Sequence, residues 1–250
     1  MSATTPRLRM FGGPNGSGKS TLKSYLPAAL LGVYLNPDEM EQEIRRQGFL
    51  DFTAYGVGTT PDEVLPFFQN SSFLGSAGYS EAARKLTFSQ DRLEFGNVAV
   101  NSYLASVASD FLRQKLLAQK TSFTLETVMS HDSKVELLAE AQSAGYRTYL
   151  YFVATDDPAI NISRVRSRVK LGGHDVPEDR IAKRYQRSLD LLLVAIQHTN
   201  RAYVFDNSGD KQRHTWLAEI TDGQKLEMKT DQAPAWFRRA VLDKINPPPA

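Results

Sequence analysis

Apolar and polar residues alternate along the chain in blocks that predict strands and helices in turn. Short apolar runs, typical of buried strands, occupy residues 8–12, 33–36, 123–127, 147–154 and 202–206, and a weaker run occupies 225–229. Stretches with helical periodicity lie near residues 19–27, 39–47, 97–119, 134–143, 158–170, 177–198 and 234–244. This order predicts an α/β fold of three layers, in which helices cover both faces of a mainly parallel sheet.

Residues 51–96 interrupt that order. Glycine, serine, threonine and aromatic residues are frequent between 51 and 79, which predicts an inserted segment built of short helices. We therefore expect a single domain over residues 1–250, with this insertion and with a frayed tail at 245–250.

The composition is that of an ordinary globular protein, with 41% hydrophobic and 23% charged residues. A net charge of +2 gives no reason to expect binding to nucleic acids or to membranes. The chain has no cysteine, which excludes disulfides and thiolate chemistry, and it has no apolar run of 18 residues. We expect a soluble cytoplasmic protein without a signal peptide.

The most specific motif follows the first predicted strand, where glycines precede a lysine and two hydroxyl residues. It matches G-x-x-x-x-G-K-[ST], the P-loop, and its residues are Gly13, Pro14, Asn15, Gly16, Ser17, Gly18, Lys19 and Ser20, followed by Thr21. In a P-loop, backbone N–H groups surround phosphate oxygens, and the next helix adds the positive end of its dipole. We expect Lys19 to reach the β- and γ-phosphates of a nucleotide and the Ser20 hydroxyl to bind Mg²⁺. The motif predicts binding of ATP or GTP.

Other motifs separate the classes of P-loop protein. A GTPase carries an N-K-x-D signature for guanine, and this chain has none. A motor ATPase or helicase has adjacent Asp-Glu after an apolar strand, whereas Asp156 and Asp157 precede Pro158 and resemble a helix cap. A small-molecule kinase needs a base for the acceptor hydroxyl, a carboxylate near Mg²⁺ and arginines over the transferred phosphoryl group.

Two carboxylates stand at the ends of predicted strands. Asp38 follows the strand at 33–36 and Glu126 lies in the strand at 123–127, so both should lie at the sheet edge that carries the P-loop. One could orient or deprotonate an acceptor hydroxyl, and the other could organise Mg²⁺ or hold the substrate. Asp38 has a second interpretation, as the cap of the helix that follows it. Glu126 is harder to explain by structure alone, because an acid that closes an apolar strand needs a partner or a task.

Arginines cluster in a region at 164–187 that we interpret as a lid. One narrow arc of the helix at 177–198, separate from its apolar stripe, carries Arg180, Arg184 and Arg187. The preceding helix offers Arg164 and Arg168, and Gly172, Gly173 and His174 between the two helices predict a hinge. The alternative is a pair of solvated helices whose arginines pair with surface carboxylates.

Taken in order, five motifs resemble the zeta-toxin family of P-loop kinases. They are GGPNGSGKST, NPDE, FTLET, GGHDVPEDRIAKRYQRSL and YVFDNSG, and the similarity covers about residues 10–40 and 97–210. The resemblance implies a fold like that of nucleotide and shikimate kinases. It also implies ATP-dependent phosphorylation of a hydroxyl on a UDP-linked amino sugar, usually UDP-N-acetylglucosamine.

The resemblance also implies roles for particular residues. Lys19 and Ser20 would bind phosphate and Mg²⁺, and Asp38 would be the base on the sugar hydroxyl. Glu126, with Thr127, would contact the substrate. Arginines of the 164–187 region would stabilise the transferred phosphoryl group, and the position of Asn207 suggests contact with the adenine. The best-known members of the family have a small antitoxin that blocks the ATP site, so a protein of that kind is a candidate partner.

The chain departs from the compact members of the family at residues 51–96, which are longer. This segment lies between Asp38 and Glu126 in the sequence, where an acceptor-binding region would form. Two alternatives therefore stay open. One is a P-loop kinase for an unrelated metabolite, and the other is a non-catalytic ATP-binding module that reports nucleotide state to a protein partner.

Overall fold

The computed structural model describes residues 5–173, 175–209 and 214–246. By their contacts the residues fall into two units, the first formed by residues up to 31 and from 124 onward, the second by residues 32–123. The predicted hinge residue His174 and the end of the predicted frayed tail, from 247 onward, lie outside the described residues. That the whole chain forms a single domain stays a prediction.

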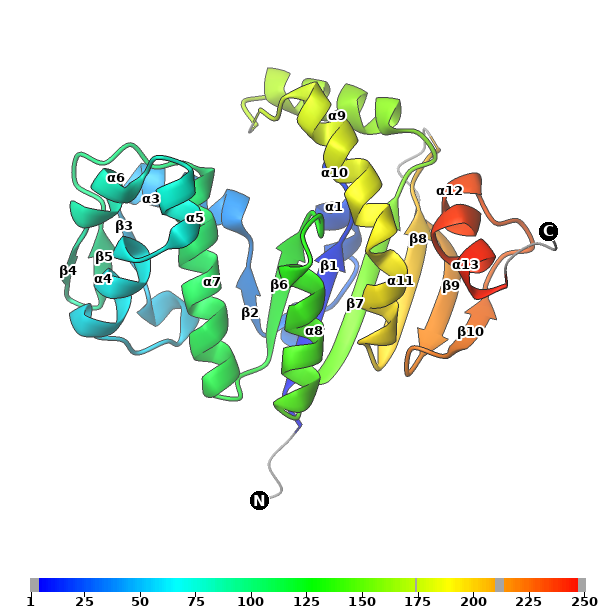
Figure 1. Cartoon of the computed structure of the whole chain (residues 1–250), viewed down its shortest axis with the longest axis horizontal. Helices are drawn as coiled ribbons and strands as arrows, with labels where there is room; N and C mark the ends of the chain where they lie inside the picture. Colours follow the sequence, from blue (N-terminus) through cyan, green and yellow to red (C-terminus); the bar gives the residue numbers. More distant parts are fainter. Residues whose placement is uncertain (1–4, 174, 210–213, 247–250) are drawn as a thin grey trace. The chain divides into compact units, whose positions relative to one another are not determined.

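A mainly parallel sheet forms the centre of the first unit (Figure 1). Its strands, in the spatial order β10-β9-β8-β7-β1-β6, are β1 (Arg7–Gly12), β6 (Phe123–Thr127), β7 (Arg147–Ala154), β8 (Arg201–Asp206), β9 (Thr215–Thr221) and β10 (Lys225–Met228). Strands β1, β7 and β8 run parallel, so their carboxyl ends meet at one edge of the sheet, whereas β9 and β10 are antiparallel to their neighbours. The predicted α/β fold is confirmed.

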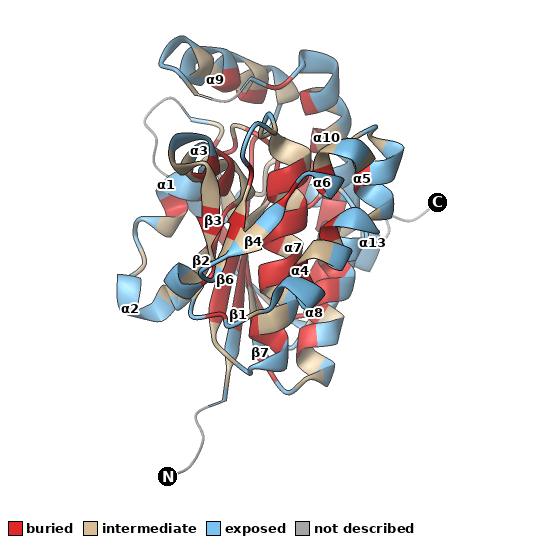
Figure 2. Ribbon diagram, turned by 90° about the vertical axis from the view of Figure 1, so that its left-hand side faces the viewer, coloured by how far each residue is buried: buried red, intermediate tan, exposed pale blue. Residues whose placement is uncertain are grey.

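Helices cover both faces of this sheet. On one face, Leu22 of α1 (Lys19–Lys23) packs against Phe11 and Val153. On the other face, Phe152 contacts Trp236 of α12 (Ala235–Phe237). The first unit also contains α2 (Ala28–Leu31), α8 (Ser133–Ser143), α9 (Pro158–Lys170), α10 (Glu178–Asp190), α11 (Leu192–Gln197), the π-helical turn η2 (Arg238–Leu242) and α13 (Asp243–Ile245). Strand β1 is buried from its second residue onward. Figure 2 shows buried residues along the central strands, so the sheet lies inside the unit.

Several elements of the first unit differ from the prediction. Helix α1 ends at Lys23, earlier than expected, and the helix predicted at 177–198 is divided at Leu191 into α10 and α11. The C-terminal helix is likewise divided, into α12, η2 and α13. Strand β9 was not predicted, because its register shifts by one residue opposite Val204 and Phe205 and its apolar residues do not alternate.

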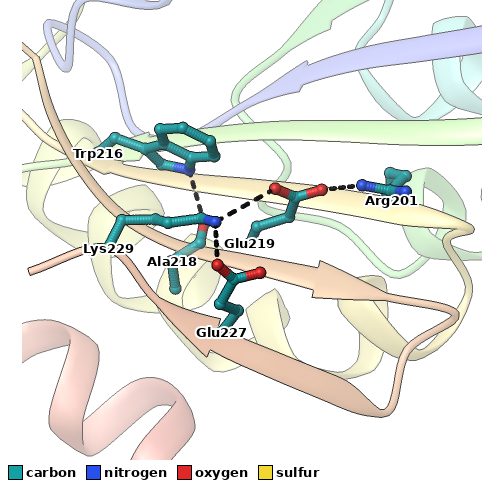
Figure 3. Close-up of polar contacts among 6 residues, drawn as sticks. All are labelled: Arg201, Trp216, Ala218, Glu219, Glu227 and Lys229. Carbon is teal, nitrogen blue, oxygen red and sulfur yellow. Dashed lines mark hydrogen bonds and ion pairs between the residues drawn. The ribbon is translucent and has the colours of Figure 1, made fainter.

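Ion pairs join β9 to the strands beside it (Figure 3). Glu219 of β9 pairs with Arg201 of β8, and its second oxygen lies 3.8 Å from Nζ of Lys229. Lys229 also pairs with Glu227 of β10, and its ammonium group lies 4.9 Å from the centre of the Trp216 ring. These contacts connect β9 to β8 and to the residue that follows β10.

The second unit combines helices with a small antiparallel sheet. Its elements are β2 (Val33–Leu35), α3 (Pro37–Gln47), η1 (Thr53–Tyr55), α4 (Pro61–Gln69), α5 (Ser72–Ser76), α6 (Ser80–Arg84), α7 (Ser102–Ala118) and the sheet β3-β5-β4 (Phe49–Asp51, Arg92–Glu94, Thr87–Ser89). The insertion therefore contains the expected short helices and also strands that were not expected. Helix α7 begins later than predicted, because Oδ1 of Asn101 caps it by accepting from the N–H groups of Tyr103 and Leu104.

Candidate active site

The P-loop connects β1 to α1 in the first unit, and its glycines are required by the space around them. Gly13, Gly16 and Gly18 have φ values of 138°, 72° and 99°, a conformation that favours glycine. A Cβ atom on Gly13 would lie 2.0 Å from the carbonyl oxygen of Val153, and one on Gly16 would lie 2.7 Å from that of Asn161. The glycines therefore let the P-loop pass close to the end of β7 and to α9.

Side-chain donors hold most of the carbonyl groups of the P-loop. Nζ of Lys19 donates to the carbonyls of Gly13 and Pro14, at 2.8 and 2.9 Å. Three further contacts are Asn161 Nδ2 to Asn15 O at 2.6 Å, Asn207 Nδ2 to Ser17 O at 2.8 Å and His214 Nε2 to Gly18 O at 3.0 Å. The C=O and N–H of a planar trans peptide point in opposite directions, so a carbonyl held on one side directs the next N–H to the other side. The contacts with the carbonyls of residues 14, 15, 17 and 18 thus orient the N–H groups of Asn15, Gly16, Gly18 and Lys19, whereas Gly13 is followed by proline, which has no N–H.

Ser20 and Glu126 meet at the carboxyl edge of the sheet. The Ser20 hydroxyl donates to the Glu126 carboxylate, with Oγ 2.9 Å from Oε1 and 3.2 Å from Oε2. Next to Glu126, Oγ1 of Thr127 accepts from the backbone N–H of Met129 at 3.1 Å. Hydroxyl and carboxylate oxygens are ligands that Mg²⁺ prefers, so this pair fits a magnesium ion beside the P-loop.

Within the described ranges, no group of three or more His, Asp or Glu side chains is placed to hold a metal. A P-loop does not need such a group, because Mg²⁺ is bound there by one or two protein ligands together with water and nucleotide phosphates.

Two residues that follow β8 in the sequence, Asn207 and His214, contact the P-loop. The guanidinium of Arg164 on α9 holds residues 207 and 209, since it donates to the carbonyls of Asn207 at 2.8 Å and Gly209 at 3.2 Å. Burial lowers the pKa of His214 below its ordinary value of 6.5; the contact with the Gly18 carbonyl acts in the opposite direction, and the charge of Arg164 lowers it further. His214 is therefore neutral at pH 7 and carries its proton on Nε2, the atom that faces the carbonyl.

Helix α10 carries the three predicted arginines on its outer side. Arg180 and Arg187 are exposed and Arg184 is half-buried. A separate face of the helix is buried, where Ile181 packs with Val165 and Val176. Figure 1 places α9 and α10 next to each other, and an ion pair between Arg166 and Glu178 links them. Contact of the arginines with a phosphoryl group stays a prediction.

Asp38 belongs to the second unit, where it lies in the first turn of α3. The cap of this helix is Asn36, whose Oδ1 accepts from the backbone N–H of Asp38 at 3.0 Å. The interpretation of Asp38 as the cap is therefore wrong. Its half-buried carboxylate has no capping function, and its role as a base stays a prediction.

In the comparison with protein families, residues 98–214 match the model of the Zeta toxin family. Over this range the chain is zeta-toxin-like. The resemblance predicted from the motifs is thereby confirmed. The match begins after the P-loop at 13–20, so the nucleotide site of this zeta-toxin-like chain rests on the motif and on the geometry described above.

Among curated proteins, an uncharacterized protein of Haemophilus influenzae is 30% identical over 69 residues, which are 28% of this chain and 49% of that protein. Among solved structures, a chain of the AvrRxo1-ORF1:AvrRxo1-ORF2 complex with sulphate ions has a TM-score of 0.54 at 11% identity, over 91% of this chain and 62% of that one. The same complex with ATP has a TM-score of 0.54 at 13% identity, over 91% and 61% of the two chains. The zeta-toxin-like chain thus spans about half of the curated relative and less than two thirds of the matched chain of the AvrRxo1 complex, with which it shares the fold.

Two residues of the site, Asn161 and His214, had not been predicted. Both act on backbone carbonyls, and neither belongs to a motif.

As for membranes, none of the helices in the described residues combines the length and the apolar character that a membrane span requires.

Proposed function

We propose that the chain is an ATP-dependent phosphotransferase of the zeta-toxin type, which phosphorylates a hydroxyl of a UDP-linked amino sugar such as UDP-N-acetylglucosamine. The observation that carries the proposal is the contact of Ser20 with Glu126 beside a braced P-loop. The zeta-toxin match of residues 98–214 supports the reaction class. The choice of ATP is supported by the AvrRxo1-ORF1:-ORF2 complex, one chain of which shares the fold and which has been described with ATP.

In this proposal the P-loop binds the triphosphate. Its N–H groups would face the phosphate oxygens, and Nζ of Lys19 would exchange the carbonyls of Gly13 and Pro14 for β- and γ-phosphate oxygens. Ser20 would bind Mg²⁺, which neutralises charge on the phosphates when it is present. Glu126 would keep the Ser20 hydroxyl oriented and, together with Thr127, face the substrate.

The acceptor hydroxyl would lose its proton to Asp38 as its oxygen attacks the γ-phosphorus. The bond from the γ-phosphorus to the bridging oxygen then breaks, and ADP leaves with that oxygen. Charge on the transferred group would be balanced by arginines of α10, namely Arg180, Arg184 and Arg187. Asn207, which lies against the P-loop, would line the nucleotide side of the site.

A protein partner is part of the proposal. AvrRxo1-ORF1 has been described in complex with AvrRxo1-ORF2, and the zeta-toxin resemblance implies a small antitoxin. We infer a cytoplasmic protein whose activity such a partner would restrain.

The test is a screen of phosphate acceptors with γ-labelled ATP, with the Lys19→Ala variant as a control. Label on UDP-N-acetylglucosamine or a related sugar nucleotide supports the proposal. Label on another metabolite alone shows a P-loop kinase of different specificity. ATP binding without transfer to any member of a broad panel shows the non-catalytic module instead.

A further inference from the structure

Asn161 of α9 contacts the P-loop at two successive residues. Its Nδ2 donates to the carbonyl of Asn15 at 2.6 Å, and its own backbone presses on Gly16, where a Cβ would lie 2.7 Å from the Asn161 oxygen. The side chain is fully buried, so loss of its donor would leave a buried carbonyl without its partner. No motif in the sequence marks this residue.

A chain of buried hydrogen bonds orients the Asn161 side chain through its oxygen, Oδ1. Oγ1 of Thr155, directly after β7, donates to Oδ1 of Asn161. The hydroxyl of Tyr185, on α10, donates in turn to the carbonyl of Thr155 at 2.7 Å. Thr155 is fully buried and Tyr185 is 5% exposed. Burial raises the pKa of Tyr185 to about 12, so the hydroxyl keeps its proton and remains a donor at physiological pH.

We propose that Asn161 is a positioning residue of the nucleotide site, which holds the Asn15 carbonyl so that the N–H of Gly16 faces the bound phosphate. Since the peptide is planar and trans, fixing this carbonyl fixes the N–H on its opposite side. A peptide that is not held must be ordered by the ligand, and ATP then binds more weakly. The inference rests on the proposed function in taking ATP as the ligand, and its expectation for Tyr185 also takes from it the role of the arginines of α10.

Thr155 connects α10, which carries Arg180, Arg184 and Arg187, to the P-loop by way of Asn161. Tyr185 follows Arg184 in α10, and its hydroxyl attaches that helix to the same Thr155 whose side chain orients Asn161. Asn161 therefore acts on nucleotide binding, whereas Tyr185 acts on the placement of the arginines. Loss of the first contact affects the dissociation constant for ATP, and loss of the second affects kcat.

The experiment compares variants that lose single hydrogen-bonding groups. Asn161→Ala removes the donor to Asn15, Thr155→Val keeps the shape of threonine without its hydroxyl, and Tyr185→Phe removes only the phenolic hydroxyl. The matched control is Thr199→Val, because Thr199 is 1% exposed and its Oγ1 donates to the Ile196 carbonyl at 2.7 Å, beside the amino end of β8. Calorimetry measures ATP binding directly, and thermal unfolding measures stability.

We expect Asn161→Ala and Thr155→Val to weaken ATP binding about tenfold, the size expected for the loss of a buried hydrogen bond. Thr199→Val should lower the unfolding temperature similarly and leave ATP binding unchanged. Tyr185→Phe should keep the dissociation constant within about twofold while kcat falls about tenfold. If Asn161→Ala does not fold, Thr155→Val decides the question.

Parent-like ATP binding by Thr155→Val overturns the inference, and so does equal weakening by Thr199→Val, which would show a purely structural effect. A parent chain that binds no ATP overturns both this inference and the proposed function. A parent chain that binds ATP but transfers no phosphate to any acceptor overturns the proposed function alone.

Discussion

The hydroxyl of Ser20 donates to both carboxylate oxygens of Glu126, at 2.9 and 3.2 Å, and so joins the P-loop to the end of β6. The two residues are 106 positions apart in the sequence. The Ser20 hydroxyl at the start of α1, which we propose as a ligand of Mg²⁺, is oriented here by a carboxylate at the end of the neighbouring strand. We therefore expect the Mg²⁺ concentration that the reaction requires to depend on Glu126.

Glu126→Gln should raise the Mg²⁺ concentration needed for half-maximal transfer by about 10- to 100-fold, the usual effect of losing a group that orients a metal ligand. The amide keeps the shape of the side chain, so the unfolding temperature should change little. Glu136→Gln, at an exposed position on α8, is the matched control. An unchanged Mg²⁺ dependence in Glu126→Gln would remove Glu126 from the metal side of the site.

Lys19→Ala should abolish phosphate transfer without unfolding the chain. Nζ of Lys19 donates to two P-loop carbonyls, so the substitution removes two hydrogen bonds that hold the loop. It also removes the positive charge that would contact the β- and γ-phosphates. Transfer is measured with labelled ATP, and Lys23→Ala, at the other end of α1, is the control. Full activity in a folded Lys19→Ala protein would contradict the P-loop assignment.

The arginines of α10 are tested by lysine substitutions at Arg180, Arg184 and Arg187. Lysine keeps the charge but lacks the planar fork of arginine, so kcat should drop by about 10³ at the residue that contacts the transferred group. ATP affinity should change much less. Arg166→Lys, whose parent residue pairs with Glu178, serves as the control. Near-normal kcat in all three variants would assign the role to other arginines.

The Asp38→Asn variant tests whether the Asp38 carboxylate acts as the base or has only a structural role. Asparagine cannot accept the proton, so transfer should fall by about 10²–10⁴ while ATP binding persists. Stability should be nearly unchanged, because the cap of α3 is Asn36. Asn36→Ala is the converse control and should cost about 1 kcal/mol of unfolding free energy through loss of the cap. Transfer at the parent rate by Asp38→Asn would direct the search for the base to Glu126.

The elements that the sequence predicted best are those whose residues carry strong local patterns. Strands 123–127 and 147–154 and the helix at 158–170 were predicted with the bounds that the structure shows, because β-branched and aromatic residues mark the strands and Asp157-Pro158 marks the helix start. Strand β9 was missed because the register shift beside it breaks the alternation of apolar residues.

The residues of the candidate site likewise include some that the sequence predicted and some that it did not. The P-loop and Glu126 follow from a motif and from the rule that ligands bind at the carboxyl ends of parallel strands. Asn161 and His214 could not be predicted, because their partners are backbone carbonyls 146 and 196 positions away. A backbone carbonyl is present at every residue, so a contact with one leaves no pattern of residue types that a single sequence would reveal.

His214 gives the structure a pH dependence that can be measured. Its Nε2 donates to the Gly18 carbonyl, the Tyr25 and Phe205 rings lie edge-on to it, and Arg164 is the charged group among the described residues that lowers its pKa. The folded pKa lies below 6.5, the ordinary value, so between the two values the unfolded chain binds a proton that the folded chain does not. Stability is therefore lost as the pH falls from about 6.5 toward the folded pKa, and no such loss occurs above pH 7.5.

His214→Gln should remove this loss, because glutamine can donate an N–H to Gly18 from a similar position and does not titrate. The unfolding free energies of parent and variant should differ by a constant amount above pH 7.5. Between pH 7 and pH 5 the difference should shift in favour of the variant, by about 1.4 kcal/mol for each unit by which the folded pKa is lowered. Chemical denaturation across this pH range measures the shift. A difference that stays constant down to pH 5 would show that His214 is not held neutral against the P-loop.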